Sequence, residues 1–249
     1  MAESKIGTGT YMVAFPEHML VVGRTASGKS SLVGDMFSNI DHVYRRNTKD
    51  NIIVVMSPHE VIDRNFIKRF NSNENWTIIY FSIDSFDENS ANGLLAYLKN
   101  NGLLHKEVFL FLDDLAINAC ASKKRNNFIL KAFATYRHYN ISLIVTVQVA
   151  EKDFVSLMEN SGLVIVLKNF GYHKTLEMML RTFVFSIKVP SLIRRLSSFF
   201  SETKHIGDHV VFNFTFPAAQ NSVYFITDNI INSSHGYTKR EIENLCKQL

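Results

Sequence analysis

The chain has 249 residues, of which 46% are hydrophobic and 20% are charged, and it contains 4 prolines and 2 cysteines. This apolar fraction is too high, and the proline count too low, for a chain that is disordered throughout, while the length suits one large α/β domain. The formal net charge of +4, from 27 Lys and Arg against 23 Asp and Glu, is too small to indicate nucleic-acid binding by itself.

Cysteine usage and hydropathy indicate the compartment. Cys120 and Cys246 are too few for a disulfide framework or a zinc cluster, which favours a reducing environment. No run approaches the roughly 18 apolar residues of a membrane span, and the first residues lack the basic and apolar parts of a signal peptide. We therefore expect an intracellular protein with no membrane span, not a secreted one.

Short, unbroken runs of β-branched and aromatic residues alternate with longer mixed segments along most of the chain. Such runs are typical of strands buried on both faces of a parallel sheet. The predicted strands are residues 18–22, 51–56, 76–81, 108–112, 142–147 and 163–167. The predicted helices are residues 29–38, 91–100, 123–138, 153–160 and 172–181. This alternation predicts an α/β fold, with a mainly parallel central sheet and helices on both faces.

The pattern changes towards the C-terminus. Residues 210–216 and 223–227 are apolar runs separated by a turn-like segment, which predicts an antiparallel hairpin. Thr238 and Glu241 have capping-box spacing and predict a terminal helix over residues 238–249. Because we find no repeat or linker, we expect a single domain over residues 1–249. It would comprise an N-terminal segment (1–15), a core (16–182) and C-terminal additions (183–249).

A glycine-rich motif lies between the first predicted strand and the first predicted helix. Residues 23–30 (GRTASGKS) match GxxxxGK[ST], the Walker A pattern, at every fixed position. Glycines let successive N–H groups curl around a phosphate; Lys29 would reach the terminal phosphates of ATP and Ser30 would bind Mg²⁺. The alternative is a glycine-rich turn with an accidental Lys-Ser. The predicted nucleotide-binding residues are Gly23, Arg24, Thr25, Ala26, Ser27, Gly28, Lys29, Ser30 and Ser31.

Two carboxylates follow the predicted strand at residues 108–112. The segment VFLFLDD has the Walker B form, and a buried parallel strand delivers its carboxyl end to the crevice beside a phosphate loop. Asp113 would hold the Mg²⁺, and Asp114 would orient or deprotonate the attacking water. The alternative is that the pair caps the next helix.

The next predicted strand ends just before Gln148. In hydrolases with an additional strand between the two Walker strands, a polar residue here senses the γ-phosphate. Gln148 is therefore a candidate catalytic residue, and an ordinary polar residue at a strand end is the alternative.

Residues 135–148 (TYRHYNISLIVTVQ), with GRTASGKS and VFLFLDD, resemble the FtsK/HerA superfamily. They are most similar to the genome-packaging ATPases of double-jelly-roll DNA viruses, the group of poxvirus, virophage and Polinton or Maverick-type enzymes. The likeness covers roughly residues 15–170, and residues after about 182 match nothing that we can name. Asp114 departs from the pattern, because many relatives have Glu there.

The resemblance implies a P-loop NTPase fold of the ASCE class and an ATPase that uses ATP and Mg²⁺ to move double-stranded DNA into a preformed capsid. It implies a ring homo-oligomer, a hexamer or pentamer, that meets capsid protein at a vertex. The protein would work in the host cytoplasm or nucleus and accompany the virion.

Ring assembly also has a physical basis. A 249-residue domain has a radius of gyration of roughly 18 Å, too small to encircle a duplex, so several copies are needed. An arginine from one copy could then stabilise the transition state in its neighbour. The candidates are Arg137, Arg181, Arg194 and Arg195, of which Arg137 is preferred because it lies in the family-like segment. A cation that offsets a helix dipole is the alternative for Arg137.

Three basic clusters are candidates for sequence-independent DNA contacts. They are Arg45 with Arg46, Lys123 with Lys124 and Arg125, and Arg194 with Arg195. Each is equally consistent with a solvated surface. The alternative functions are a small-molecule or nucleotide kinase, another DNA-translocating or remodelling ATPase, and a non-hydrolysing nucleotide-binding scaffold.

Overall fold

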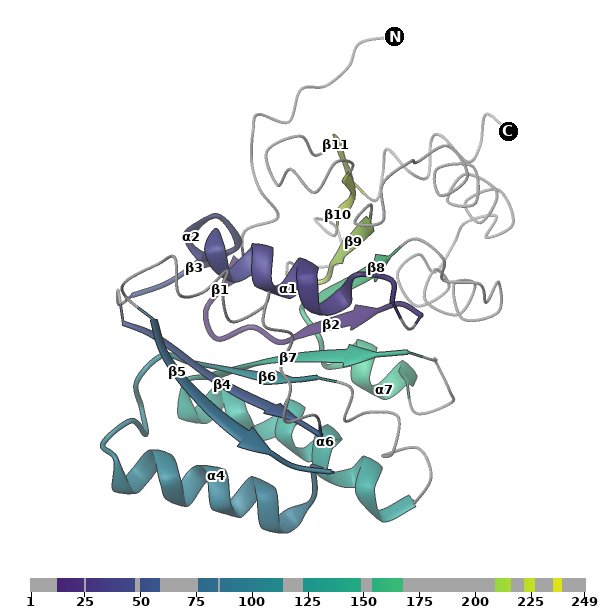
Figure 1. Cartoon of the computed structure of the whole chain (residues 1–249). Helices are drawn as coiled ribbons and strands as arrows, with labels where there is room; N and C mark the ends of the chain where they lie inside the picture. Colours follow the sequence, from purple (N-terminus) through teal and green to yellow (C-terminus); the bar gives the residue numbers. More distant parts are fainter. Residues whose placement is uncertain are drawn as a thin grey trace, which may run out of the picture.

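The computed structural model describes residues 13–24, 26–47, 50–58, 76–84, 86–113, 123–148, 154–167, 209–215, 222–226 and 235–238 (Figure 1). Its strands are β1 (Val13–Ala14), β2 (Met19–Val22), β3 (Tyr44–Arg45), β4 (Asn51–Ser57), β5 (Trp76–Ser82), β6 (Val108–Leu112), β7 (Ile141–Val147), β8 (Leu163–Leu167), β9 (His209–Asn213), β10 (Ser222–Ile226) and β11 (His235–Thr238). Its helices are α1 (Lys29–Ser38), α2 (Ile40–Val43), α4 (Glu88–Asn100), α6 (Lys123–Thr135), the 3₁₀ turn η1 (Tyr136–Tyr139) and α7 (Phe154–Glu159).

Nine of the described strands form one sheet, in the order β11-β10-β9-β8-β2-β7-β6-β4-β5. The six strands from β8 to β5 run parallel, as predicted, and β9, β10 and β11 add antiparallel to the β8 edge. Strand β7 lies between β2 and β6, with Val22 opposite Val147 and Leu112 opposite Val145. The additional strand between the two Walker strands is therefore confirmed, and the carboxyl ends of all three lie at one edge.

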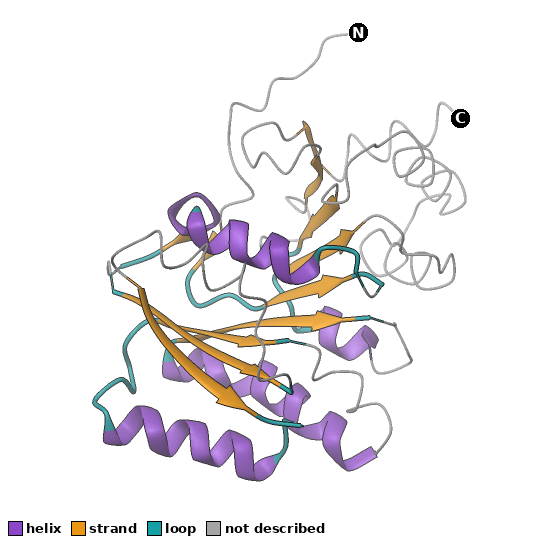
Figure 2. Ribbon diagram, viewed as in Figure 1, coloured by secondary structure: helices purple, strands orange, loops and turns teal. Residues whose placement is uncertain are grey.

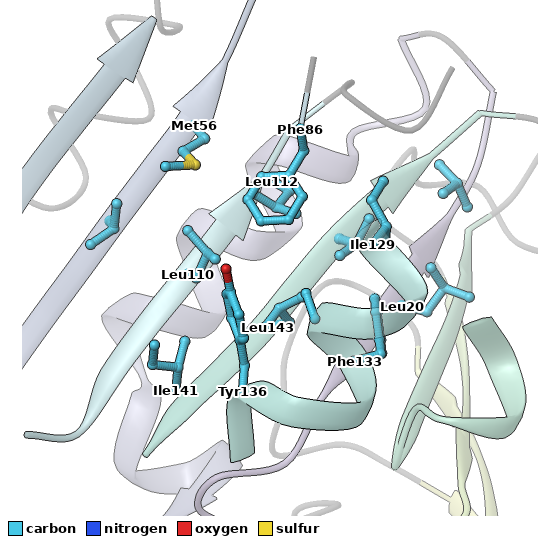
Figure 3. Close-up of a cluster of buried hydrophobic side chains, with 14 of the residues drawn as sticks. Leu20, Met56, Phe86, Leu110, Leu112, Ile129, Phe133, Tyr136, Ile141 and Leu143 are labelled. Carbon is cyan, nitrogen blue, oxygen red and sulfur yellow. The ribbon is translucent and has the colours of Figure 1, made fainter. Parts of the chain in front are cut away.

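Helices cover both faces of the sheet, α1 and α2 on one side and α4, α6 and α7 on the other (Figures 1 and 2). Successive side chains of a strand point to opposite faces, so the buried strands feed two cores. Leu110 and Leu112 join α4 and α6 in one core (Figure 3), whereas Phe109 and Phe111 join α1 in the other. This double burial explains why β6 is apolar at every position.

Several boundaries differ from the predictions. The α-helix predicted over residues 123–138 ends at Thr135 and tightens into η1, which closes on Asn140 at a φ of 56°. Strands β1 and β3 form a separate two-stranded parallel sheet that the pattern did not predict, because two residues are too short for a period to show. The predicted helix at residues 172–181 lies outside the described residues. The predicted terminal helix does too, apart from Thr238, which ends β11.

The C-terminal hairpin is confirmed as the β9–β10 pair, and β11 extends it. Because β9 pairs with β8, this addition continues the main sheet. No helix in the described part of the chain is long and apolar enough to cross a membrane.

A buried histidine ties β2 to β7 at the amino end of both strands. His18 Nδ1 accepts a hydrogen bond from the Leu143 amide at 3.0 Å, and its ring packs edge-on against Phe133 at 5.2 Å. Burial lowers the pKa of His18 to about 3, and the positive charge of Arg137 acts in the same direction. The folded chain therefore holds a neutral imidazole at pH values where the unfolded chain holds a charged one.

This difference makes stability depend on pH. Between pH 3 and the ordinary histidine pKa of about 6.5, the unfolded chain binds a proton at His18 that the folded chain does not, so the free energy of unfolding rises with pH. The contribution lost on going from pH 7 to pH 5 is about 2 kcal/mol. His18→Asn keeps an acceptor for the Leu143 amide and is expected to remove most of this slope in urea unfolding, whereas His105→Asn, at an exposed position, should retain it. An unchanged slope in His18→Asn would contradict the buried neutral histidine.

Candidate functional site

The loop between β2 and α1 lies at the carboxyl edge of the sheet, beside the ends of β7 and β6 (Figure 2). The Gly23 amide donates to the Val147 carbonyl at 3.1 Å, which fixes the start of the loop to the end of β7. The Asp113 amide donates to the Met56 carbonyl at 3.0 Å, which fixes Asp113 at the end of β4. Backbone bonds between neighbouring strands thus place both motifs at the same edge.

The described residues of the loop make a tight turn before α1. Gly28 has a φ of 88° and caps α1, a conformation that glycine adopts without strain, and Ala26 has a φ of 58°. The Ser27 amide donates to the Arg24 carbonyl at 3.1 Å. Lys29 Nζ donates to the carbonyls of Gly23 and Arg24, both at 3.0 Å, and so lies within the curve of the loop. Thr25 lies outside the described residues.

The start of α1 suits a negatively charged ligand. The first turn of α1, which includes Ser30 and Ser31, holds no acidic residue that would offset the positive end of the helix dipole. Ser27 is buried, and its Oγ has no hydrogen-bond partner among the described residues. A phosphate in the loop would meet N–H groups, the helix end and the Lys29 ammonium together.

Asp113 connects the loop to two strands. Its Oδ2 accepts a hydrogen bond from Ser30 Oγ at 3.0 Å, and its Oδ1 accepts one from Thr146 Oγ1 at 2.7 Å. The side chains of Ser30 and Asp113, 83 positions apart in the sequence, are therefore in direct contact. A serine hydroxyl beside an aspartate carboxylate is the hard oxygen donor set that Mg²⁺ takes in proteins, so the residues present fit that ion.

Sequence reasoning missed Thr146. It is fully buried in a strand that is otherwise apolar apart from Ser142, and it lies two residues before Gln148. The sequence signal that could have identified Thr146 was its hydroxyl group, on a strand predicted to run between the two Walker strands. Gln148 itself follows β7 directly and is half-buried at the same edge. Asp114 lies outside the described residues.

Arg137 is not part of this cluster. It precedes β7, whereas Gln148 follows it, and seven strand residues span roughly 23 Å. Its Nη2 contacts Glu17 Oε1 at 2.6 Å and the Asn160 carbonyl at 2.7 Å, at the amino edge of the sheet. Arg137 is therefore separated by the length of the sheet from the phosphate loop of its own chain.

The basic clusters have different surroundings. Arg45 is exposed on β3, but the Arg46 side chain is only 4% exposed. The Arg46 guanidinium pairs with Asp41 at 2.6 Å and lies 6.0 Å from the centre of the Phe109 ring. This burial leaves Arg46 unable to face a DNA phosphate, so we do not retain it as a DNA contact.

The remaining predicted cations lie at the start of α6 or outside the described residues. Lys123, Lys124 and Arg125 begin α6, and only their backbone is described. The other arginine candidates, Arg181, Arg194 and Arg195, lie outside the described residues.

The fold has counterparts among solved structures. The chain is similar to the genome-packaging NTPase B204 from Sulfolobus turreted icosahedral virus 2 in complex with ATPγS, with a TM-score of 0.53 and 15% identity over 80% of this chain and 93% of that one. It is likewise similar to B204, the DNA-packaging ATPase from Sulfolobus turreted icosahedral virus, with the same TM-score, identity and coverage. No protein-family model and no curated protein matches the sequence. The chain has the fold of a P-loop NTPase.

The tight packing of the loop gives a direct test of the site. A Cβ on Gly23 would lie 2.4 Å from Ser27 Oγ and 3.2 Å from Leu167 Cβ. Gly23→Ala should therefore displace the loop and weaken ATPγS binding about tenfold or more, measured by calorimetry. Adding Ser27→Ala should restore part of the affinity.

The matched control for Gly23→Ala is Gly93→Ala. A Cβ there meets nothing within 4 Å, and Gly93 lies in the exposed part of α4. This variant should bind ATPγS as the wild type does and should stabilise the helix by about 0.5–1 kcal/mol. Equal affinities in the two glycine variants would show that the nucleotide does not bind in this loop.

Proposed function

We propose that the protein is an ATP-hydrolysing DNA translocase of the FtsK/HerA type that packages double-stranded viral DNA into a preformed capsid as a ring homo-oligomer. The observation that carries the ATPase part is the contact between Ser30 and Asp113 beside a loop of Walker A sequence. The resemblance of residues 135–148 to packaging ATPases supports the DNA part. The fold shared with a protein described as a DNA-packaging ATPase supports it as well.

The residues of the carboxyl edge have separate roles in this proposal. The N–H groups of the loop and Lys29 bind the phosphates, while Ser30 and Asp113 hold Mg²⁺, which when bound offsets phosphate charge. Asp114 takes a proton from the attacking water, and Gln148 orients the γ-phosphate and the water. Two consecutive aspartates, with a glutamine directly after the adjacent strand, suit transfer of the γ-phosphoryl group to water. They suit transfer to the substrate of a kinase less well.

The ring has a structural argument of its own. Because Arg137 lies at the amino edge, it can reach a phosphate only in another copy of the chain. We propose that neighbouring copies, six or five in a closed ring, meet with the amino edge of one against the carboxyl edge of the next. Such head-to-tail contacts generate closed rings. DNA would run through the ring against the start of α6, which holds Lys123–Arg125, and against Arg45 on β3. The ring would bind capsid protein at a vertex.

ATP hydrolysis with and without duplex DNA tests the proposal. The wild type should hydrolyse ATP faster when DNA is present, and Lys29→Ala and Asp114→Asn should each reduce the rate by about 100-fold or more. Lys106→Ala removes an exposed lysine that pairs with Asp50 and should have little effect. Activity that survives both site variants would refute the assignment. A rate of ATP hydrolysis that DNA does not change in an assembled ring would favour a kinase or a scaffold.

Mixing two inactive variants tests action in trans. Arg137→Ala retains its phosphate loop and Lys29→Ala retains its arginine, so about a quarter of the interfaces in a randomly mixed ring pair an intact loop with an intact arginine. The mixture is expected to hydrolyse ATP at a corresponding fraction of the wild-type rate. A mixture as inactive as its components would show that Arg137 does not act on a neighbour.

A further inference from the structure

Glu17 and Arg137 form an ion pair at the amino edge of the sheet, away from the phosphate loop. Arg137 Nη2 lies 2.6 Å from Glu17 Oε1 and 2.7 Å from the Asn160 carbonyl. Glu17 precedes β2, Arg137 lies in η1 and Asn160 follows α7. Two other parts of the chain thus hold one nitrogen of the Arg137 guanidinium.

The carboxylate side of this pair is built into the fold. A Cβ on Gly162 would lie 2.2 Å from both Cγ and Cδ of Glu17, so the Glu17 side chain occupies space that only a glycine leaves. Glu17 Oε1 also accepts the His18 amide at 3.0 Å. The backbone carbonyl of Glu17 accepts hydrogen bonds from Tyr44 Oη, at 3.1 Å, and from Ser142 Oγ. Glu17 therefore has little freedom to follow a moving arginine.

Burial makes the charge of Glu17 depend on Arg137. The Glu17 side chain is 18% exposed, and its burial raises the pKa of the carboxyl above the usual range. The positive charge of Arg137 and the amides of His18 and Gly162 lower that pKa and offset part of the effect. A carboxylate kept charged in this setting exerts a strong orienting force on the cation beside it.

The Arg137 side chain is partly exposed. Its exposed fraction is 40%, and within the described part of the chain its hydrogen bonds and its ion pair all involve Nη2. The Nε and Nη1 groups carry the other N–H donors of the guanidinium. One end of the planar group is fixed, so the remaining donors keep a set direction relative to that end.

Building on the proposed function, we infer that Glu17 is the positioning residue of Arg137. By fixing Nη2, it directs the Nε and Nη1 donors of Arg137 to the terminal phosphate of a nucleotide bound by a second copy of the chain. A guanidinium that is already oriented loses less conformational freedom when it meets the transition state. Glu17 never touches the nucleotide, because it lies behind Arg137.

The test compares Glu17→Gln with wild type in the assembled ring with DNA. Glutamine keeps the shape and an acceptor for the His18 amide but removes the charge. We expect kcat to fall about tenfold while KM for ATP and the affinity for ATPγS stay within about twofold, because the phosphate loop of the same chain is untouched. Asp50→Asn is the matched control, since it removes a carboxylate from the exposed pair with Lys106, and it should leave kcat unchanged.

Mixed rings separate positioning from a general structural role. In rings mixed equally from Glu17→Gln and Lys29→Ala subunits, only the Glu17→Gln subunits have an intact phosphate loop. Half of these loops have a Lys29→Ala neighbour, in which Glu17 still holds Arg137. The rate per intact loop should therefore rise about fivefold over that of Glu17→Gln alone. If the rate per intact loop does not rise in the mixed rings, the defect lies within the Glu17→Gln subunit itself. That result would overturn the inference and leave Glu17 with a structural role only. If Glu17→Gln unfolds at the assay temperature, Glu17→Asp, which withdraws the charge by one methylene, serves in its place with the same expectations.

The outcomes also separate this inference from the proposed function. A wild type with no ATPase activity refutes the proposed function. An active, DNA-stimulated wild type with an equally active Glu17→Gln variant refutes only the role of Glu17.

Discussion

The candidate site depends on the two hydrogen bonds that Asp113 accepts, from Ser30 and from Thr146. These bonds join the start of α1 to the ends of β6 and β7, and they form because the parallel register brings the three carboxyl ends level. A shift of one residue in β7 would turn Thr146 to the opposite face of the sheet and remove its hydroxyl from Asp113. Packing of the two cores therefore sets the distances in the site, and the chemistry follows from the packing.

The two edges of the sheet have different tasks in this account. The carboxyl edge gathers the phosphate loop, Asp113 and Gln148, which we propose bind one nucleotide in one chain. The amino edge holds Arg137 on the partly buried carboxylate of Glu17. A single chain cannot bring the two edges together, so a site that uses both requires a neighbour. The net charge of +4 agrees with the proposed motor, whose contacts with DNA would be repeated around a ring.

Much of this arrangement could be predicted from sequence, because it rests on strong local signals. The boundaries of β6, β8 and α1 were predicted to the residue, since apolar runs and the GKS motif mark them sharply. The surroundings of Thr146 and Arg46 could not be predicted. Both depend on which side chains the fold brings together, Thr146 with Asp113 at the ends of neighbouring strands and Arg46, just after β3, with Phe109 on β6, and sequence spacing does not contain that information. The sequence predicts a surface position for Arg46. In the structure its guanidinium lies over Phe109 and pairs with Asp41, contacts that only the fold creates.

A crystal structure of the protein with ATPγS and Mg²⁺ would test directly whether this edge of the sheet binds the nucleotide. The account predicts the β-phosphate inside the loop of residues 23–30, with Mg²⁺ bound to Ser30 Oγ at about 2.0–2.1 Å and Asp113 beside it, directly or through one water. A triphosphate bound elsewhere, or a metal ion held away from both Ser30 and Asp113, would contradict it.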